Sequence, residues 1–437
     1  MSLRLLPTFP RGPLALIVAL ALAGCGGGGG SAAGSSGNDS GSGGTTLPPF
    51  VLGAFHDLAS PTGAAAVTNM TDMMVIGDHA VLRSDSATLS GTQHVPTRFN
   101  LLDSQGNVSA SVDYGLTLAG GYTGDWIMLP TAGGFALLQA AGGSKLYQFD
   151  AQASQIAPAA GINLYALPAG DNPPSIVSNA AAVDGNGIWV ATTLGYPQTD
   201  KTVIYRLNLT KIDWNGKALT PTAPIWTSSK SLFPRVAASN GAVMLSWSDA
   251  GTPMMAVWAQ SGGLPVMKSM GAGGGALDFR PLALNGSGRL GLLWGVQADH
   301  SGNLAGLAFD SDGNAVLSPN GAADNWDAEV MSANWKGSRL GVDYDARAID
   351  GKLYVADVVG DPVNGVTVSG NAIMLADYTL TNGPLSTSAS LTLWTLRAST
   401  DKPIATAAVL RQAMFADHAV LLIGDSKHTE AAIVTRH

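Results

Sequence analysis

Short runs of apolar residues, each followed by a small polar turn, recur along most of this 437-residue chain. Gly, Asn, Asp, Ser and Pro interrupt the runs at intervals of about eight to twelve residues, which is typical of β-strands joined by tight turns. No stretch keeps apolar residues at helical spacing over several turns. The pattern therefore predicts an all-β protein.

One apolar strand recurs in seven copies, each time after a polar turn. The central residues of the copies are Val81, Phe135, Ile188, Val243, Leu290, Leu340 and Val420. Successive copies are separated by 54, 53, 55, 47, 50 and 80 residues. The one long interval contains a further strand-like stretch, residues 371–395, which we interpret as an insertion.

Each copy has a strand before it and another after it. Around Val243, for example, these are residues 235–238 and 253–258. Several of the following strands end in an Asp–Gly turn such as Asp310–Gly313, in which Asp bonds its own backbone and Gly supplies a positive φ. Seven units of three or four antiparallel strands predict a single β-propeller with seven blades over residues 48–437.

The two ends of this region are predicted to meet. The last unit reaches His437 without an outermost strand, whereas the strand-like segment Phe50–Phe55 has no partner in the first unit. We therefore expect the N-terminal segment to complete the last blade and close the ring.

The first 24 residues have the pattern of a secretory leader. Arg4 and Arg11 are followed by an apolar run of 11 residues, which is shorter than the ~20 residues that a spanning helix needs. The segment Leu22–Cys25 (Leu-Ala-Gly-Cys) resembles the lipobox of bacterial lipoproteins in all four positions. The resemblance covers only the leader. It implies that residues 1–24 are a signal peptide and that Cys25 carries the lipid.

A Gly- and Ser-rich stretch follows the cysteine. Residues 25–47 therefore read as a lipidated cysteine with a flexible, disordered tether. Gly26 stands where lipoproteins retained in the inner membrane usually have Asp, so the resemblance implies a lipid-anchored protein of the outer membrane. The membrane is thus one expected partner.

Composition narrows the range of functions. Charged residues make up 12% of the chain, about half the usual share, and the net charge is −8. Without a basic cluster, this charge argues against nucleic-acid binding. The acidic residues are 29 Asp and only two Glu, and scarce Glu and Lys argue against a helical bundle. A single Cys excludes a disulfide framework and a cysteine-based zinc site.

Catalytic motifs are sparse. Two Glu, of which Glu430 lies near the C-terminus, argue against the paired Glu of a glycosidase. The sequence has no G-x-S-x-G elbow and matches no propeller enzyme signature, so we name no catalytic residue. His79 and His418 occupy equivalent places in a repeated Asp-His-Ala-Val-Leu unit, which favours a role in a turn over metal binding.

Calcium is the alternative cofactor. Residues 310–314 and the pair Asp343 and Asp345 offer clustered oxygen ligands. A polar turn and a solvated strand face are the competing interpretations of these two segments. We otherwise expect neither a metal nor a cofactor.

Charged residues at the starts of inner strands, and in turns on the same face, give a candidate ligand mouth. The predicted strand starts contain Arg235, Arg280 and Glu329, and the predicted turns contain Asp299, His300, Asp345 and Arg347. The same reasoning adds Asp72, Asp125 and Arg411 at strand starts and Asp249, Lys427 and His428 in turns. The neighbouring pair Arg235 and Arg280 is suited to an anionic group. The alternative is a solvated surface of the ring.

We therefore expect a lipid-anchored propeller of the cell envelope that serves as a binding or scaffold module for an envelope protein or a small anionic ligand. A hydrolase or lyase acting on envelope or extracellular polymers is the alternative, and a structural adhesin is a third. An enzyme should bury opposed carboxylates or a His–carboxylate pair at the mouth. A binding module should present a broad face with aromatic residues, for which Trp126, Trp226, Trp326 and Trp335 are candidates.

Overall fold

The chain divides between Thr46 and Leu47, and all the residues described below belong to the second unit. The computed structural model describes residues 50–59, 61, 67–68, 70–85, 95–116, 126–156, 158, 160–165, 167, 173–185, 187–269, 277–284, 290–296, 303–314, 329–330, 345–349, 352–359, 362–363, 366–367, 372–379, 409–424 and 428–436. In these residues there is no helix with the length and hydropathy to cross a membrane.

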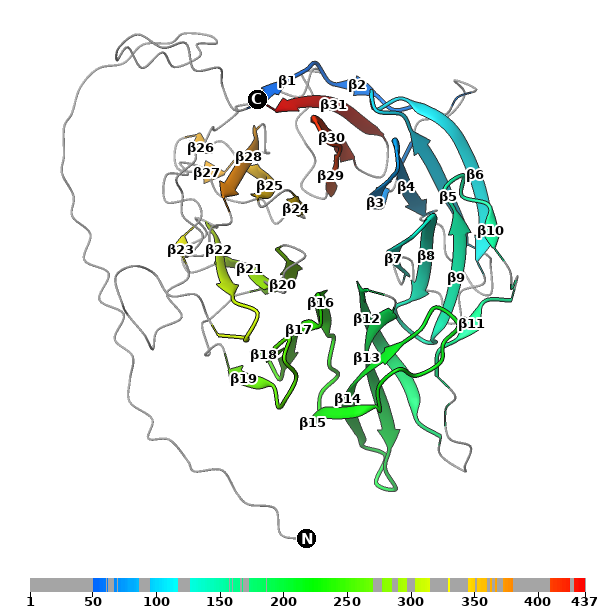
Figure 1. Cartoon of the computed structure of the whole chain (residues 1–437), viewed down its shortest axis with the longest axis vertical. Coiled ribbons are helices and arrows are strands. Elements are labelled where there is room, and N and C mark those ends of the chain that lie inside the picture. The colour runs from blue at the N-terminus through cyan, green and yellow to red at the C-terminus, as the bar shows by residue number, and fades with distance from the viewer. Residues whose placement is uncertain are drawn as a thin grey trace, which may run out of the picture. The chain divides into compact units, whose positions relative to one another are not determined.

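The described strands form seven antiparallel sheets of three to five strands, numbered here in chain order (Figure 1). Sheet 1 contains β3 (Met70–Ile76), β4 (His79–Asp85), β5 (Val95–Leu102) and β6 (Val108–Leu116). Sheet 2 contains β7 (Trp126–Thr131), β8 (Gly134–Gln139), β9 (Lys145–Asp150), β10 (Gln155–Ile156) and β11 (Ile162–Asn163). Sheet 3 contains β12 (Ser175–Asp184), β13 (Gly187–Pro197), β14 (Val203–Ile212) and β15 (Ala223–Ser228).

The remaining sheets follow the same order. Sheet 4 contains β16 (Arg235–Ser239), β17 (Ala242–Asp249), β18 (Thr252–Trp258) and β19 (Val266–Ser269). Sheet 5 contains β20 (Leu277–Ala283), β21 (Leu290–Val296), β22 (Asn303–Phe309) and β23 (Glu329–Val330). Sheet 6 contains β24 (Asp345–Ile349), β25 (Lys352–Val359) and β28 (Ala372–Thr379). Sheet 7 contains β29 (Val409–Met414), β30 (His418–Gly424), β31 (Thr429–Arg436), β1 (Phe50–Leu52) and β2 (His56–Asp57). A small ribbon of β26 (Pro362–Val363) and β27 (Val366–Thr367) accompanies them.

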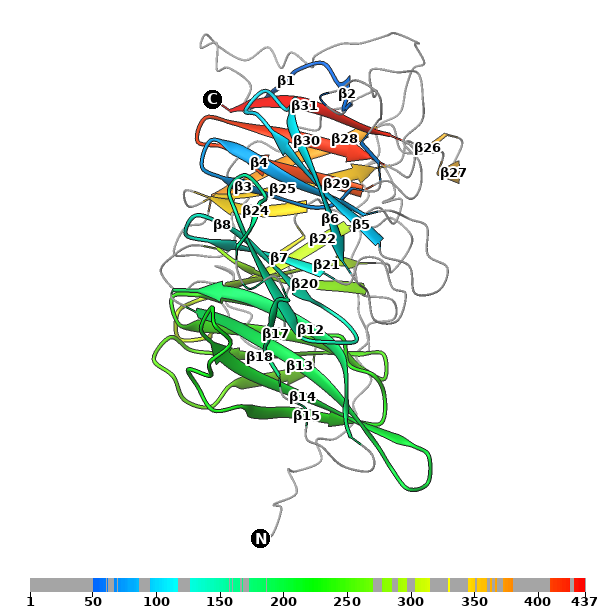
Figure 2. The same cartoon turned by 90° about the vertical axis from the view of Figure 1, so that its right-hand side faces the viewer.

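The first strands of the seven sheets contact one another in a closed order. β3 contacts β7, and the contacts continue through β12, β16, β20, β24 and β29 back to β3. Figure 1 shows these strands around a common centre, and the side view in Figure 2 shows β29 to β31 beside β3 and β4. The prediction of an all-β propeller is confirmed.

In sheets 2 and 4 the second strand is buried along most of its length, as the repeat predicts. Every residue of β8 is buried, and so are the first six residues of β17. A continuous apolar run suits this place because neighbouring sheets cover both faces of the strand.

The ring closes through the N-terminal segment. β1 pairs with β31, where Phe50 lies opposite Arg436, and β2 places His56 opposite Ala431. Leu58, which is 1% exposed, packs in one cluster with residues of sheets 7 and 1. The predicted completion of the last blade is confirmed.

The structure changes the assignment of the sixth unit. Leu340 lies outside the described residues, and the second strand of sheet 6 is β25. The stretch 371–395 was predicted as an insertion, but residues 372–379 form β28, the third strand of this sheet, with Asp377 opposite Tyr354. The prediction was wrong because an apolar run does not reveal which strand it pairs with.

Four turns after third strands share one geometry. The Oδ1 atom of the first residue, Asp103, Asp150, Asp213 or Asp310, accepts hydrogen bonds from the backbone N–H groups two and four residues later, at 2.8–2.9 Å. This is the local bonding that makes Asp favourable in turns. In residues 310–314, one of the two calcium candidates, the Asp310 carboxylate thus bonds the backbone of its own turn.

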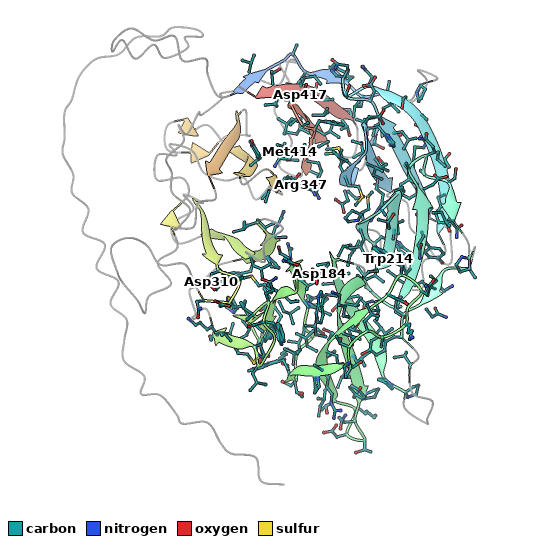
Figure 3. All side chains as sticks on the ribbon, viewed as in Figure 1. Asp184, Trp214, Asp310, Arg347, Met414 and Asp417 are labelled. Carbon is teal, nitrogen blue, oxygen red and sulfur yellow. The ribbon has the colours of Figure 1, made fainter. Side chains whose placement is uncertain are left out.

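These turns also join neighbouring sheets. In each turn the carbonyl oxygen of the second residue accepts a hydrogen bond from the preceding sheet; Figure 3 labels Trp214 and Asp310 in two of them. The donor and acceptor pairs are His418 and Ser104, His79 and Ala151, Gln148 and Trp214, and Gln260 and Ser311.

The two histidines of the repeated unit have matching contacts. The Nδ1 atom of His79 lies 3.1 Å from Asp78 Oδ1, and its Nε2 atom lies 2.7 Å from the Ala151 carbonyl oxygen. His418 has the same contacts, at 2.6 Å from Asp417 and 2.7 Å from the Ser104 carbonyl oxygen. The predicted turn role of both histidines is confirmed.

Candidate functional site

The innermost strands of all seven sheets line a cavity of about 480 Å³. This volume lies within the ~300–1,000 Å³ that is usual for small-molecule sites. The charged lining residues are Asp72, Arg83, Arg235, Arg280, Asp345, Arg347 and Arg411. Uncharged residues of β3, β7, β12, β16, β20 and β24, with Pro234 just before β16, complete the lining.

The cavity has the opposite charge to the protein. Five arginines against two aspartates leave a net charge of +3 in the lining, whereas the chain carries −8. These five are drawn from only 13 arginines in the chain, and the lining contains no lysine. Because Arg suits bidentate contacts with carboxylates and phosphates, the site is suited to an oxyanion.

Asp345 and Arg347 form a fixed pair on β24. Asp345 Oδ2 accepts hydrogen bonds from Arg347 Nε at 3.1 Å and from the backbone N–H of Gln412 at 2.8 Å. Arg347 also donates to the Met73 carbonyl oxygen at 3.1 Å, which ties sheet 6 to sheet 1. Figure 3 shows Arg347 on the side of its sheet that faces the centre of the ring.

Burial works to lower the pKa of Arg347, and Arg280 acts in the same direction. The carboxylates of Asp345 and Asp72 outweigh both, so the pKa of Arg347 is raised above its ordinary value. The guanidinium group is therefore a permanent cation at neutral pH.

Arg411 of sheet 7 and Arg83 of sheet 1 each bond a backbone carbonyl group of the next sheet. Arg411 donates to the Thr71 carbonyl oxygen from Nε at 3.0 Å and from Nη2 at 2.6 Å. Arg83 is 1% exposed and donates to the Trp126 carbonyl oxygen at 2.7 Å. Asp72 lies directly opposite Arg83 in the β3–β4 ladder.

Arg235 and Arg280 occupy matching positions on adjacent sheets. Arg235 lies opposite Ser246, three residues beyond the repeat position Val243. Arg280 likewise lies opposite Leu293, three residues beyond the repeat position Leu290. The two inner strands β16 and β20 contact each other. Arg235 is exposed and Arg280 half-buried. Two cationic groups thus reach the cavity from neighbouring strands.

The structure brings together four members of the predicted mouth: Arg235, Arg280, Asp345 and Arg347. Of the further residues in that register, Asp72 and Arg411 also line the cavity. Asp345 and Arg347 both do so from the inner strand β24, although they were predicted to lie in a turn.

The predicted position of Glu329 was wrong. It belongs to β23, which pairs with β22 at the edge of sheet 5 opposite to β20. The segment was expected to begin an inner strand, but pairing across the sheet makes it an outermost one. Its strand is thus separated from the inner strand by two others.

Other predicted residues lie elsewhere. Asp299, His300, Asp125 and Lys427 are outside the described residues. Asp249 accepts hydrogen bonds from Trp226 Nε1 at 2.8 Å and Ser228 Oγ at 2.5 Å, so both Asp249 and that candidate aromatic have a structural role. Neither Asp249 nor His428 is among the cavity residues.

Two buried polar residues of the cavity were not predicted from the sequence. Arg83 is one, and an arginine directly after the buried run Ala80–Leu82 is the signal that marks it. Asn179, 5% exposed, is the other; its amide donates to the carbonyl oxygens of Gln139 and Gly143 at 2.8 and 2.7 Å. Nothing in the local sequence distinguishes Asn179 from a turn residue.

In the part of the chain that the structure describes, no group of three or more His, Cys, Asp or Glu side chains is arranged to hold a metal ion. The cavity lining contains two carboxylates and no histidine. Its chemistry is thus dominated by fixed positive charge.

No protein-family profile and no curated protein sequence matches this chain. Solved structures that are similar to it include a chain from a study of two prolyl endopeptidases, with 10% identity and a TM-score of 0.40, covering 85% of this chain and 50% of that chain. TolB from Acinetobacter baumannii has 13% identity and a TM-score of 0.32, with coverage of 80% and 78%. An ACO/RPE65 chimera has 11% identity and a TM-score of 0.39, with coverage of 86% and 87%. The chain thus spans half the length of the first of these.

Proposed function

We propose that this protein is a lipid-anchored binding module of the bacterial cell envelope whose central cavity takes a small anionic ligand. The observation that supports the proposal is the excess of three positive charges in the lining of a cavity within an acidic protein. Concentrated positive charge in a partly desolvated cleft attracts anions and orients them.

The hydrogen bonds of the two cavity carboxylates favour a binding function over hydrolysis. Asp345 is bonded to Arg347 and to the backbone of Gln412, and Asp72 accepts a hydrogen bond from the N–H of Met73 at 2.8 Å. A general acid or base must be able to reach the proton that it transfers, whereas both carboxylates bond atoms of the cavity wall. A scaffold for ligand binding needs no such group.

The test is calorimetric titration of the full-length chain in detergent with inorganic phosphate. We expect the double variant Arg235→Gln, Arg280→Gln to bind phosphate at least about a hundredfold more weakly, because each hydrogen bond to a charged group contributes ~1.5–3 kcal/mol. The matched control is Arg98→Gln with Arg206→Gln, which removes two charges from outside the cavity. Equal affinity of the two double variants, or no phosphate binding by the unmodified chain, would overturn the proposal.

The anchor rests on the lipobox resemblance at Cys25. Several acyl chains together hold a protein stably on a membrane, at ~0.8 kcal/mol for each buried CH₂ group. We expect Cys25→Ser to abolish incorporation of labelled palmitate and to move the protein from the membrane fraction to the soluble fraction. A Cys25→Ser protein that still incorporates palmitate would refute this assignment. Fractionation of the two bacterial membranes tests the outer-membrane location.

A further inference from the structure

The guanidinium group of Arg347 is held along one side and open along the other. Its Nε atom donates to Asp345 and its Nη2 atom to the Met73 carbonyl oxygen, both at 3.1 Å. A guanidinium group has five N–H donors, so these two bonds leave three, two of them on Nη1. In the part of the chain that the structure describes, Nη1 bonds no residue. The side chain is 35% exposed and lines the cavity, so the remaining donors are available to a ligand.

Asp345, the partner of Arg347, is itself fixed. A single oxygen of this buried carboxylate, Oδ2, accepts both the bond from Arg347 Nε and the bond from the Gln412 backbone N–H. The buried side chain of Gln412 donates to the carbonyl oxygens of Asp345 at 3.2 Å and Tyr354 at 3.1 Å. Sheets 6 and 7 together therefore set the position of the carboxylate, and the carboxylate orients the guanidinium group.

Arg347 lies among charges of both signs. Burial works to lower its pKa, Asp345 and Asp72 work to raise it, and Arg280 works to lower it. Arg280 on sheet 5 is thus near enough to act on Arg347 as a like charge. An anion close to both guanidinium groups would be attracted by each of them and would offset their mutual repulsion.

We propose that Arg347 contacts the ligand directly through its unbonded N–H groups, and that Asp345 is its positioning residue. The ligand class is an oxyanion that presents two oxygens to the planar N–H fork of one guanidinium group, namely a carboxylate or a phosphate. This inference rests on the proposed function and adds the contact residue and its geometry. Asp345, although negative, then favours anion binding, because it fixes the donors that the anion meets.

The test is calorimetric titration of the full-length chain in detergent with inorganic phosphate and, separately, with acetate, which distinguishes a phosphate from a carboxylate ligand. Arg347→Lys keeps the charge but loses the fork, and it should weaken binding at least about tenfold. Asp345→Ala removes the acceptor of both bonds and should weaken binding at least about fivefold, although the lining becomes more positive. Asp345→Asn removes the same charge but keeps one oxygen able to accept both bonds, so it should bind at least as tightly as the unmodified chain.

Attraction by charge alone predicts a different order of affinities. Both Asp345 variants would then bind more tightly than the unmodified chain, and Arg347→Lys would bind equally well. That result would overturn the roles of Arg347 and Asp345 and leave anion binding intact, whereas no binding of either anion by the unmodified chain would overturn both proposals. Thermal unfolding without ligand checks that each variant is folded; if Asp345→Ala is not, Arg347→Lys decides, because it leaves Asp345 and its bond from Gln412 in place.

Discussion

Leu58 gives a quantitative test of how the ring closes. Its side chain is 1% exposed and packs with Leu422 and Ala431 of sheet 7 and with Met70 of sheet 1. Shortening a buried leucine to alanine costs about 2–5 kcal/mol, through lost transfer energy and the cavity that remains. With an unfolding entropy of ~2.1 cal/mol/K per residue over about 390 residues, Leu58→Ala should lower Tm by ~2–6 °C.

The assay is thermal unfolding followed by calorimetry and circular dichroism. Leu264→Ala is the matched control, because Leu264 is 94% exposed and its loss should change stability by less than ~0.5 kcal/mol. Equal Tm values for the two variants would refute the role of Leu58 in closure. Removal of residues 48–57 takes away β1 and β2 together and should lower Tm further, with faster amide exchange in β31. Unchanged exchange there would contradict the pairing.

Two further predictions concern contacts between sheets. Asp184 is 6% exposed, and its burial works to raise its pKa. Hydrogen bonds from Lys211 at 2.8 Å and from the Gly241 N–H at 3.1 Å outweigh this effect, so the pKa of Asp184 is lowered. A lowered folded-state pKa gives stability that is complete above the unfolded value of ~3.9 and is lost as the pH falls through the folded value. Asp184→Asn should therefore cost about 2 kcal/mol at pH 7 in urea unfolding, because hydrogen bonds to a charged group contribute ~1.5–3 kcal/mol. The difference should shrink below about pH 4, and a difference independent of pH would contradict this. His79→Ala and His418→Ala should each lower the free energy of unfolding by about 1 kcal/mol. Their effects should add because the two contacts lie at different sheet boundaries, and strong non-additivity in the double variant would be the contrary result.

The sequence was sufficient for the architecture where the signal is local. Apolar runs and Asp–Gly turns are set by neighbouring residues, so the repeat and the turn roles of His79 and Asp310 could be predicted. The closing strand also followed from counting, because Phe50–Phe55 had no partner in its own unit. Strand order in sheet 6 could not be obtained in this way, since pairing between β25 and β28 depends on distant residues.

In the candidate site too, residues with a local sequence signal could be predicted, and residues placed by distant pairing could not. Arg235 and Arg280 were found because the repeat gives them equivalent positions. Glu329 was misplaced because a charged residue before an apolar pair has the same local pattern on an inner and an outer strand. Arg83 was missed because it comes from a second strand, where the repeat predicts apolar packing, and its bond to Trp126 lies across a sheet boundary.

The meeting of Phe50 and Arg436 has a consequence for how this chain could be rearranged. As register partners in an antiparallel ladder, their Cα atoms are about 4.5–5.5 Å apart, so a connection of a few residues would join them. New ends could then be opened between two other sheets, for example between β15 and β16, without altering any neighbour in the ring. The fold depends on the cyclic order of its sheets and tolerates a different starting point, which makes circular permutation a natural way to move the termini to another blade.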